Sequence, residues 1–232
     1  MNLNPKALNE ASNWLLFTLI VLEIFLVIIY LAGIVLIERP FDLFDLDNKD
    51  TIPSFFQASQ LFIIGLISLV FFICGNHSSE PPSQIFLLTV ALLCFYACAD
   101  EALKIHYLLP TEDHHSWKPI YLGIVLVTPF VFYRDCIALW RIYRKAVLLV
   151  AIGLGVSVIG GLGLEILKDE FLHSRLSQMF ERDELIPFFI EKLRAAVEEF
   201  SAMLGESLIL YGLFSYIVKR LEVERLSSTE KD

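Results

Sequence analysis

Long stretches of apolar residues dominate this sequence, and polar residues gather in the short intervals between them. Several stretches approach or exceed the roughly 18 residues that a helix needs to cross the hydrocarbon core of a bilayer. Segments that alternate apolar and polar residues, as in a membrane barrel, are absent. The pattern predicts an all-α membrane protein, a bundle of about six transmembrane helices. The expected segments are 11–37, 54–74, 83–106, 117–132, 146–167 and 187–220.

Proline and glycine mark the boundaries and the packing of these segments. Pro53 opens the second segment, since the first turn of a helix tolerates a missing N–H. Five glycines between residues 153 and 163 predict a close helix contact in the fifth. Residues 168–186 have an amphipathic pattern and predict an additional helical segment, either on the membrane surface or extending the fifth helix into water.

Composition supports the membrane class and excludes others. Hydrophobic residues make up 56% of the 232 residues, and the mean hydropathy is +0.63. A soluble domain is rarely so apolar. The net charge is −9, and no basic run or nucleic-acid motif occurs, so the expected partner is the lipid bilayer and not a nucleic acid. We expect residues 1–232 to form one transmembrane domain without a soluble module.

Acidic residues and one histidine recur at segment ends that should meet at one membrane face. Six segments place both termini on one side, so the third and fifth segments end, and the sixth begins, on the other side. Ionisable residues inside membrane segments are expensive and usually functional. The sequence therefore predicts a metal- or cation-binding cluster at that face. Its candidate ligands are Asp100, Glu101, His106, Glu165, Glu198 and Glu199.

Two further carboxylates lie deeper. Glu206 follows Glu199 by seven residues, so both occupy one helix stripe, and Glu23 lies at a similar depth in the first segment. No lysine or arginine is expected at that depth. A charged carboxylate there costs at least about 2.5 kcal/mol, so each must hold a proton, a hydrogen bond or a cation. Glu206 and Glu23 are the candidates for a proton or cation path.

A structural interpretation of the same residues stays open. Lys104 can pair with Asp100 or Glu101 on its own helix. The late glutamates can instead be packing contacts that are protonated or hydrogen-bonded to Ser201, Ser207 or Tyr211.

Three functions are compatible with this pattern. The leading one is ion conduction, transport or sensing by a cation- or proton-binding cluster. The second is a metal-dependent membrane enzyme acting on a lipid or quinone. The third is an accessory subunit of a larger membrane complex. No catalytic residue can be named, a bound cation is the one cofactor that the residues indicate, and a homo-oligomer remains an option.

Three short motifs resemble an uncharacterised group of small bacterial polytopic membrane proteins. They are Phe44-Asp45-Leu46-Asp47 followed by Pro53, Asp100-Glu101 with His106, and Glu198-Glu199 with Glu206. The chain departs from that pattern at Lys49 and Tyr107, where further acids are expected. The resemblance implies a fold and a bacterial source but no activity.

The orientation follows from the basic residues. Arginine and lysine are dense at 134–145 and at Lys219-Arg220, close to segment ends. The positive-inside rule therefore places both termini in the cytoplasm and the acidic cluster outside. The expected location is a bacterial inner membrane or an internal membrane.

Overall fold

The computed structural model of the chain describes residues 5–46, 48, 50–74, 81–103, 105, 118–164 and 185–229. No strand occurs in these ranges, and the expected all-α architecture is confirmed. The described ranges contain six α-helices, a short 3-10 helix, η1 (Asp42–Phe44), and a π-helix, η3 (Ser157–Leu162). The helices are α1 (Pro5–Ile37), α2 (Ile52–Cys74), α3 (Gln84–Leu103), α4 (Lys118–Val131), α5 (Tyr133–Val156) and α8 (Leu185–Thr229).

Five of the six helices are long and apolar enough to cross a membrane, and α4 is shorter. With 14 residues, α4 extends only about 21 Å. The segments expected at 117–132 and 146–167 leave residues 134–145 as a basic connection. This prediction was wrong, because these residues form the first half of α5, with a kink at Tyr143. Arg, Lys, Ala and Leu in this stretch are good helix formers despite its polarity.

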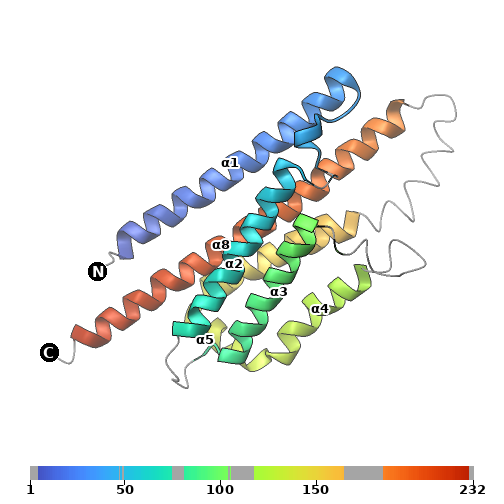
Figure 1. The fold of residues 1–232 in the computed structure, drawn as a ribbon. Helices are drawn as coiled ribbons and strands as arrows, with labels where there is room; N and C mark the ends of the chain where they lie inside the picture. Colours follow the sequence, from blue (N-terminus) through green and yellow to red (C-terminus); the bar gives the residue numbers. More distant parts are fainter. Residues whose placement is uncertain are drawn as a thin grey trace.

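The long helices lie beside one another, with α8 at the centre. Figure 1 shows α1 and α8 running in opposite directions, so that the start of α1 and the end of α8 lie at the same end of the bundle. Helix α8 contacts α1, α2, α5 and η3, whereas α3 packs on α2 and α4 on α5. The ends of α1 and α3 and the start of α8 consequently share the opposite end of the bundle, which we call the loop end.

The connection between α1 and α2 is built by local backbone chemistry. Helix α1 ends where Glu38 adopts a positive φ of 56°, and Pro40 follows. The chain then folds back over Gly33, where a Cβ would lie 2.9 Å from the Arg39 carbonyl oxygen. The Thr51 hydroxyl accepts a hydrogen bond from the Ser54 N–H and caps α2, with Pro53 in its first turn. The predicted role of Pro53 is thus confirmed.

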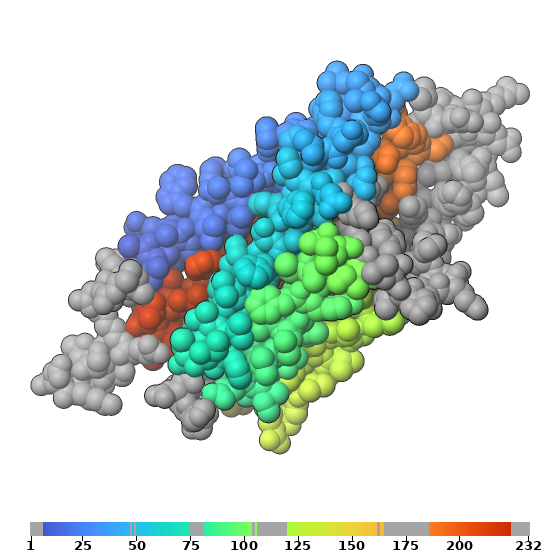
Figure 2. Space-filling view, viewed as in Figure 1, coloured from blue at the N-terminus to red at the C-terminus, as the bar shows by residue number. Residues whose placement is uncertain are grey.

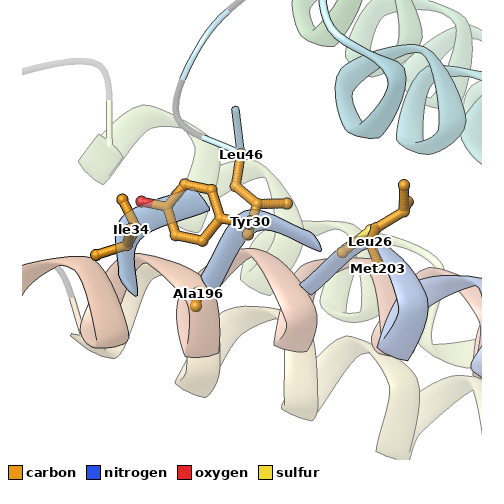
Figure 3. Close-up of a cluster of buried hydrophobic side chains, with 6 residues drawn as sticks. All are labelled: Leu26, Tyr30, Ile34, Leu46, Ala196 and Met203. Carbon is orange, nitrogen blue, oxygen red and sulfur yellow. The ribbon is translucent and has the colours of Figure 1, made fainter. Parts of the chain in front are cut away.

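A hydrophobic cluster joins α1 to α8 near the loop end. Figure 3 shows Tyr30 and Ile34 of α1 beside α8, with Leu46 lying over the Tyr30 ring. The other buried members are Leu26, Ala196 and Met203. Large apolar side chains also cover the outside of the helices, among them Phe25 and Phe62, which are about half exposed. This outer surface is suited to lipid.

Glycines bring α5 and η3 onto α8, as their spacing predicted. A Cβ on Gly153 would lie 2.5 Å from the Gly205 carbonyl oxygen, and one on Gly160 would collide with Ser201. Small residues allow this approach where lipid provides no hydrophobic drive for helix association. The predicted amphipathic segment at 168–186 falls almost wholly outside the described residues, since the structure describes the chain again from residue 185.

Candidate functional site

Helix α2 turns a polar face inward. Ser54, Gln57 and Gln60 are each less than 5% exposed, and they recur every three residues, so they share one side of the helix. Apolar residues of α2 such as Phe55 and Phe62 are exposed instead. A membrane helix arranged in this way places its hydrogen-bonding groups where other helices can satisfy them. We call Ser54, Gln57 and Gln60 the α2 ladder.

The upper two steps of the ladder contact residues from α3 and α8. The Ser54 hydroxyl donates to the backbone carbonyl of Glu101 (3.0 Å). The Gln57 amide Nε2 donates to Glu199 Oε2 (3.0 Å). Three residues of helix rise about 4.5 Å, so the two contacts follow one another inward from the loop end. Of the acids predicted to share this depth, Glu199 therefore contacts this polar face through its carboxylate and Glu101 through its backbone carbonyl.

The deepest step joins three helices. Gln60 Nε2 donates to Ser207 Oγ (2.7 Å) and to Glu23 Oε1 (3.3 Å), and Ser207 Oγ donates to the same Glu23 oxygen (2.5 Å). Glu23 and Ser207 are fully buried, and Gln60 is 2% exposed. The hydrogen bonds from Gln60 Nε2 and from Ser207 Oγ to Glu23 thus end on the same carboxylate oxygen, Oε1. Glu23 Oε2 and Gln60 Oε1 are buried without a hydrogen-bond partner in the described part of the chain.

Glu206 lies next to this step on α8. Its Oε2 atom is also buried and has no hydrogen-bond partner among the residues described. The charges that act on its carboxyl group come from Glu101, Glu199 and Glu23. Each of these three residues belongs to a different step of the ladder.

Asp100 occupies the α3 side of the loop end. It is 6% exposed and is hydrogen-bonded to the hydroxyl of Tyr121 from α4. The Tyr121 hydroxyl also lies 3.2 Å from that of Tyr96. These tyrosines give the buried Asp100 side chain polar neighbours, which a carboxyl group in this position requires.

Glu198 has a partner of its own. The Arg194 guanidinium forms ion pairs with Glu198 and with Glu191, the latter at 2.9 Å. The Arg194 side chain is only 8% exposed. The four-residue spacing of Arg194 and Glu198 places them on one helix face. This ion pair is therefore predictable from the sequence. Its neighbour Glu199 faces the ladder instead.

The structure brings together part of the predicted set. Glu101, Glu199 and Glu23 each lie close enough to Glu206 to act on its carboxyl group. His106 and Glu165 lie outside the described residues. Among the described residues, no group of three or more His, Cys, Asp or Glu side chains could hold a metal ion. The assignment of these residues as ligands stays a prediction.

Two features of the site were not predicted from the sequence: the side-chain amides of Gln57 and Gln60, and the hydrogen bond between Ser207 and Glu23. Gln57 and Gln60 were not considered, because uncharged polar residues do not stand out in an apolar segment. Their three-residue spacing from Ser54 was the available signal. Ser207 was considered as a partner of the late glutamates on its own helix, whereas it donates to Glu23 of α1.

Taken together, the apolar exterior, the helix lengths and the polar interior define a multi-pass helical membrane protein. Residues 14–217 match the model of a family described as a domain of unknown function, DUF8692, and the chain belongs to that family. No curated protein and no solved structure gives a significant match. The family description names no activity, so function has to be argued from the site.

Proposed function

We propose that this protein binds a proton or a small cation at the carboxylates along the α2 ladder and uses that binding for ion transport or sensing. The observation that carries the proposal is Glu206. Its buried oxygen lacks a hydrogen-bond partner in the described structure, and the charges around it are carboxylates from all three steps. Carboxylates crowded in hydrocarbon must share a proton or a cation, because charge is costly there.

The order of the polar groups along the ladder also supports a route for the ion. The ladder begins beside Glu101, near the loop end, and reaches Glu23 at mid-helix through Glu199. Side-chain amides, hydroxyls and carboxylates follow one another at intervals of about one helical turn. Such a series can pass a proton or a partly dehydrated cation inward. Transport and sensing both need this step.

The test measures binding first and flux second. Purified protein in lipid nanodiscs should show a thermal unfolding midpoint that depends on pH or on cation concentration, since a ligand of the folded state stabilises it. Glu206→Gln should lose that dependence. Glu222→Gln is the matched control, because it makes the same change on α8 in an exposed pair with Lys219.

Flux in proteoliposomes then separates the two uses. Under an imposed pH or cation gradient, a transporter carries ions and loses the flux in Glu206→Gln, whereas a sensor binds without flux. A wild-type midpoint that responds neither to pH nor to any cation would contradict the proposal. So would a Glu206→Gln protein that responds as the wild type does.

The metal-dependent enzyme remains the alternative. It needs a tightly held metal with an open coordination position. The described residues offer no group of three strong ligands, and His106 and Glu165 lie outside them. Elemental analysis of purified protein decides the matter: near-stoichiometric zinc, iron or manganese, lost in His106→Ala, would replace ion handling with the enzyme as the leading function.

We infer that residues 1–232 form one membrane domain. We further infer that the protein lies in a bacterial inner or internal membrane, with both termini in the cytoplasm. Arg141, Arg144 and Lys145 of α5 support this orientation under the positive-inside rule. In a cysteine-free background, an impermeant reagent added outside should label Leu43→Cys and not Glu10→Cys. The reverse result would invert the orientation. A homo-oligomer or a larger complex remains a proposal.

A further inference from the structure

The deepest step of the ladder has acceptors left over and no donors. Glu23 and Gln60 are at most 2% exposed, so water does not reach them from outside. The Gln60 N–H groups are used toward Ser207 and Glu23, and the Ser207 hydroxyl is used toward Glu23. Glu23 Oε2 and Gln60 Oε1 remain buried without hydrogen-bond partners within the described chain. Oxygen atoms in this condition require a cationic or donor ligand.

A single proton does not provide partners for both buried oxygens, Glu23 Oε2 and Gln60 Oε1. Placed on Glu23 Oε2, it provides one O–H, which can reach one acceptor. An amide oxygen such as Gln60 Oε1 is not protonated near neutral pH. A metal cation, in contrast, contacts several oxygens at once, and the Ser207 oxygen keeps a lone pair for it.

The ligand set also selects the type of cation. One carboxylate with an amide oxygen and a hydroxyl oxygen carries a single negative charge. Divalent calcium and magnesium take more carboxylates or retain waters. Zinc, copper and iron prefer imidazole and thiolate ligands. A monovalent cation that accepts neutral oxygen ligands matches the charge and the atoms.

We propose that Glu23, Gln60 and Ser207 bind a dehydrated alkali-metal cation at the junction of α1, α2 and α8. The inference rests on the proposed function and names its ligand at the deepest step. Bound there, the cation neutralises Glu23 and ties α1 to the rest of the bundle. Figure 2 shows α8 in the space between α1 and α2 toward the C-terminal end of α8, and at this junction Gln60 of α2 is hydrogen-bonded to Glu23 of α1.

The first experiment uses the wild-type protein. The unfolding midpoint in nanodiscs is measured at fixed pH in lithium, sodium or potassium chloride and in choline chloride of equal concentration. At least one alkali salt should raise the midpoint by roughly 5 °C over choline at saturation. Equal midpoints in all four salts would overturn the proposal without any variant being needed.

The second experiment locates the effect. Gln60→Leu and Ser207→Ala should weaken the apparent affinity for the alkali cation about tenfold or more, and Glu23→Gln should abolish the response. Ser68→Ala is the matched control, because the buried Ser68 hydroxyl donates to the Ile64 carbonyl of its own helix. If Gln60→Leu and Ser207→Ala keep the wild-type affinity, the cation binds elsewhere and the assignment fails.

The two proposals fail separately. If alkali salts have no effect while the pH dependence persists and is lost in Glu206→Gln, the site binds protons only; this inference falls and the proposed function stands. If neither pH nor any cation changes the midpoint, both fall.

Discussion

Helix α8 contacts its neighbours through two different kinds of surface. Toward α5 and η3 it presents small residues, and Gly205 lies so close to Gly153 that no Cβ fits between them. Toward α1 and α2 it presents Glu199 and Ser207, which bond to side chains on those helices. The same helical turns thus carry a close contact of small residues on one side and a hydrogen-bonded contact with a carboxylate on the other.

The difference separates what holds the bundle from what the bundle does. Small residues gain van der Waals contact at no desolvation cost, which is an economical way to pack helices in lipid. Buried carboxylates are the opposite, because each needs a proton, a donor or a cation. The glycine contact therefore explains stability and leaves function unexplained, whereas the carboxylate contact costs stability and points to function.

The largest expected effect is a loss of stability when the close contact between α8 and α5 is disrupted. Gly205→Leu should destabilise the protein by about 3 kcal/mol, the upper end of overpacking, because the new side chain meets the Gly153 backbone and Ser157. Gly155→Leu is the control, since a Cβ there meets nothing within 4 Å. Unfolding midpoints in nanodiscs measure both. Similar losses in the two variants would contradict the close contact.

A smaller effect of opposite sign is expected on the carboxylate side. In choline buffer at alkaline pH, where no cation or proton neutralises Glu206, Glu206→Gln should raise the free energy of unfolding by about 1–2 kcal/mol, because it removes a charge that is costly in hydrocarbon. The same variant should lose the ion or pH response, so stability and function change in opposite directions. Glu222→Gln, in an exposed ion pair, should change neither. A destabilised Glu206→Gln protein would mean that the carboxylate is structural.

The sequence predicts the two sides unequally. The glycines at 153–163 were enough to predict a close helix contact of this segment, but not that its partner is α8. The shared depth of Glu23 and Glu206 followed from counting residues along apolar segments. The charged stretch 134–145 was misassigned because hydropathy does not distinguish a polar helix from a loop. The ladder itself was missed, since the partner of Gln57 or Gln60 on another helix depends on helix rotation and contact, which one sequence does not specify.

The smallest expected effect is a difference in coupling energy between a polar contact inside the bundle and one at its exposed surface. Gln57 bonds to Glu199 inside the bundle, whereas the Tyr211 hydroxyl donates to Asn13 Oδ1 (2.6 Å) at an exposed position on the α1 side of α8. A double-mutant cycle with Gln57→Leu and Glu199→Leu should give a coupling of about 1 kcal/mol, within the range for membrane hydrogen bonds. A cycle with Tyr211→Phe and Asn13→Leu should give about 0.5 kcal/mol or less, because exposed groups can exchange this partner for others. If the exposed pair couples as strongly as the buried one, the ladder has no special energetic role, and the case for a site along α2 then rests on Glu206 alone.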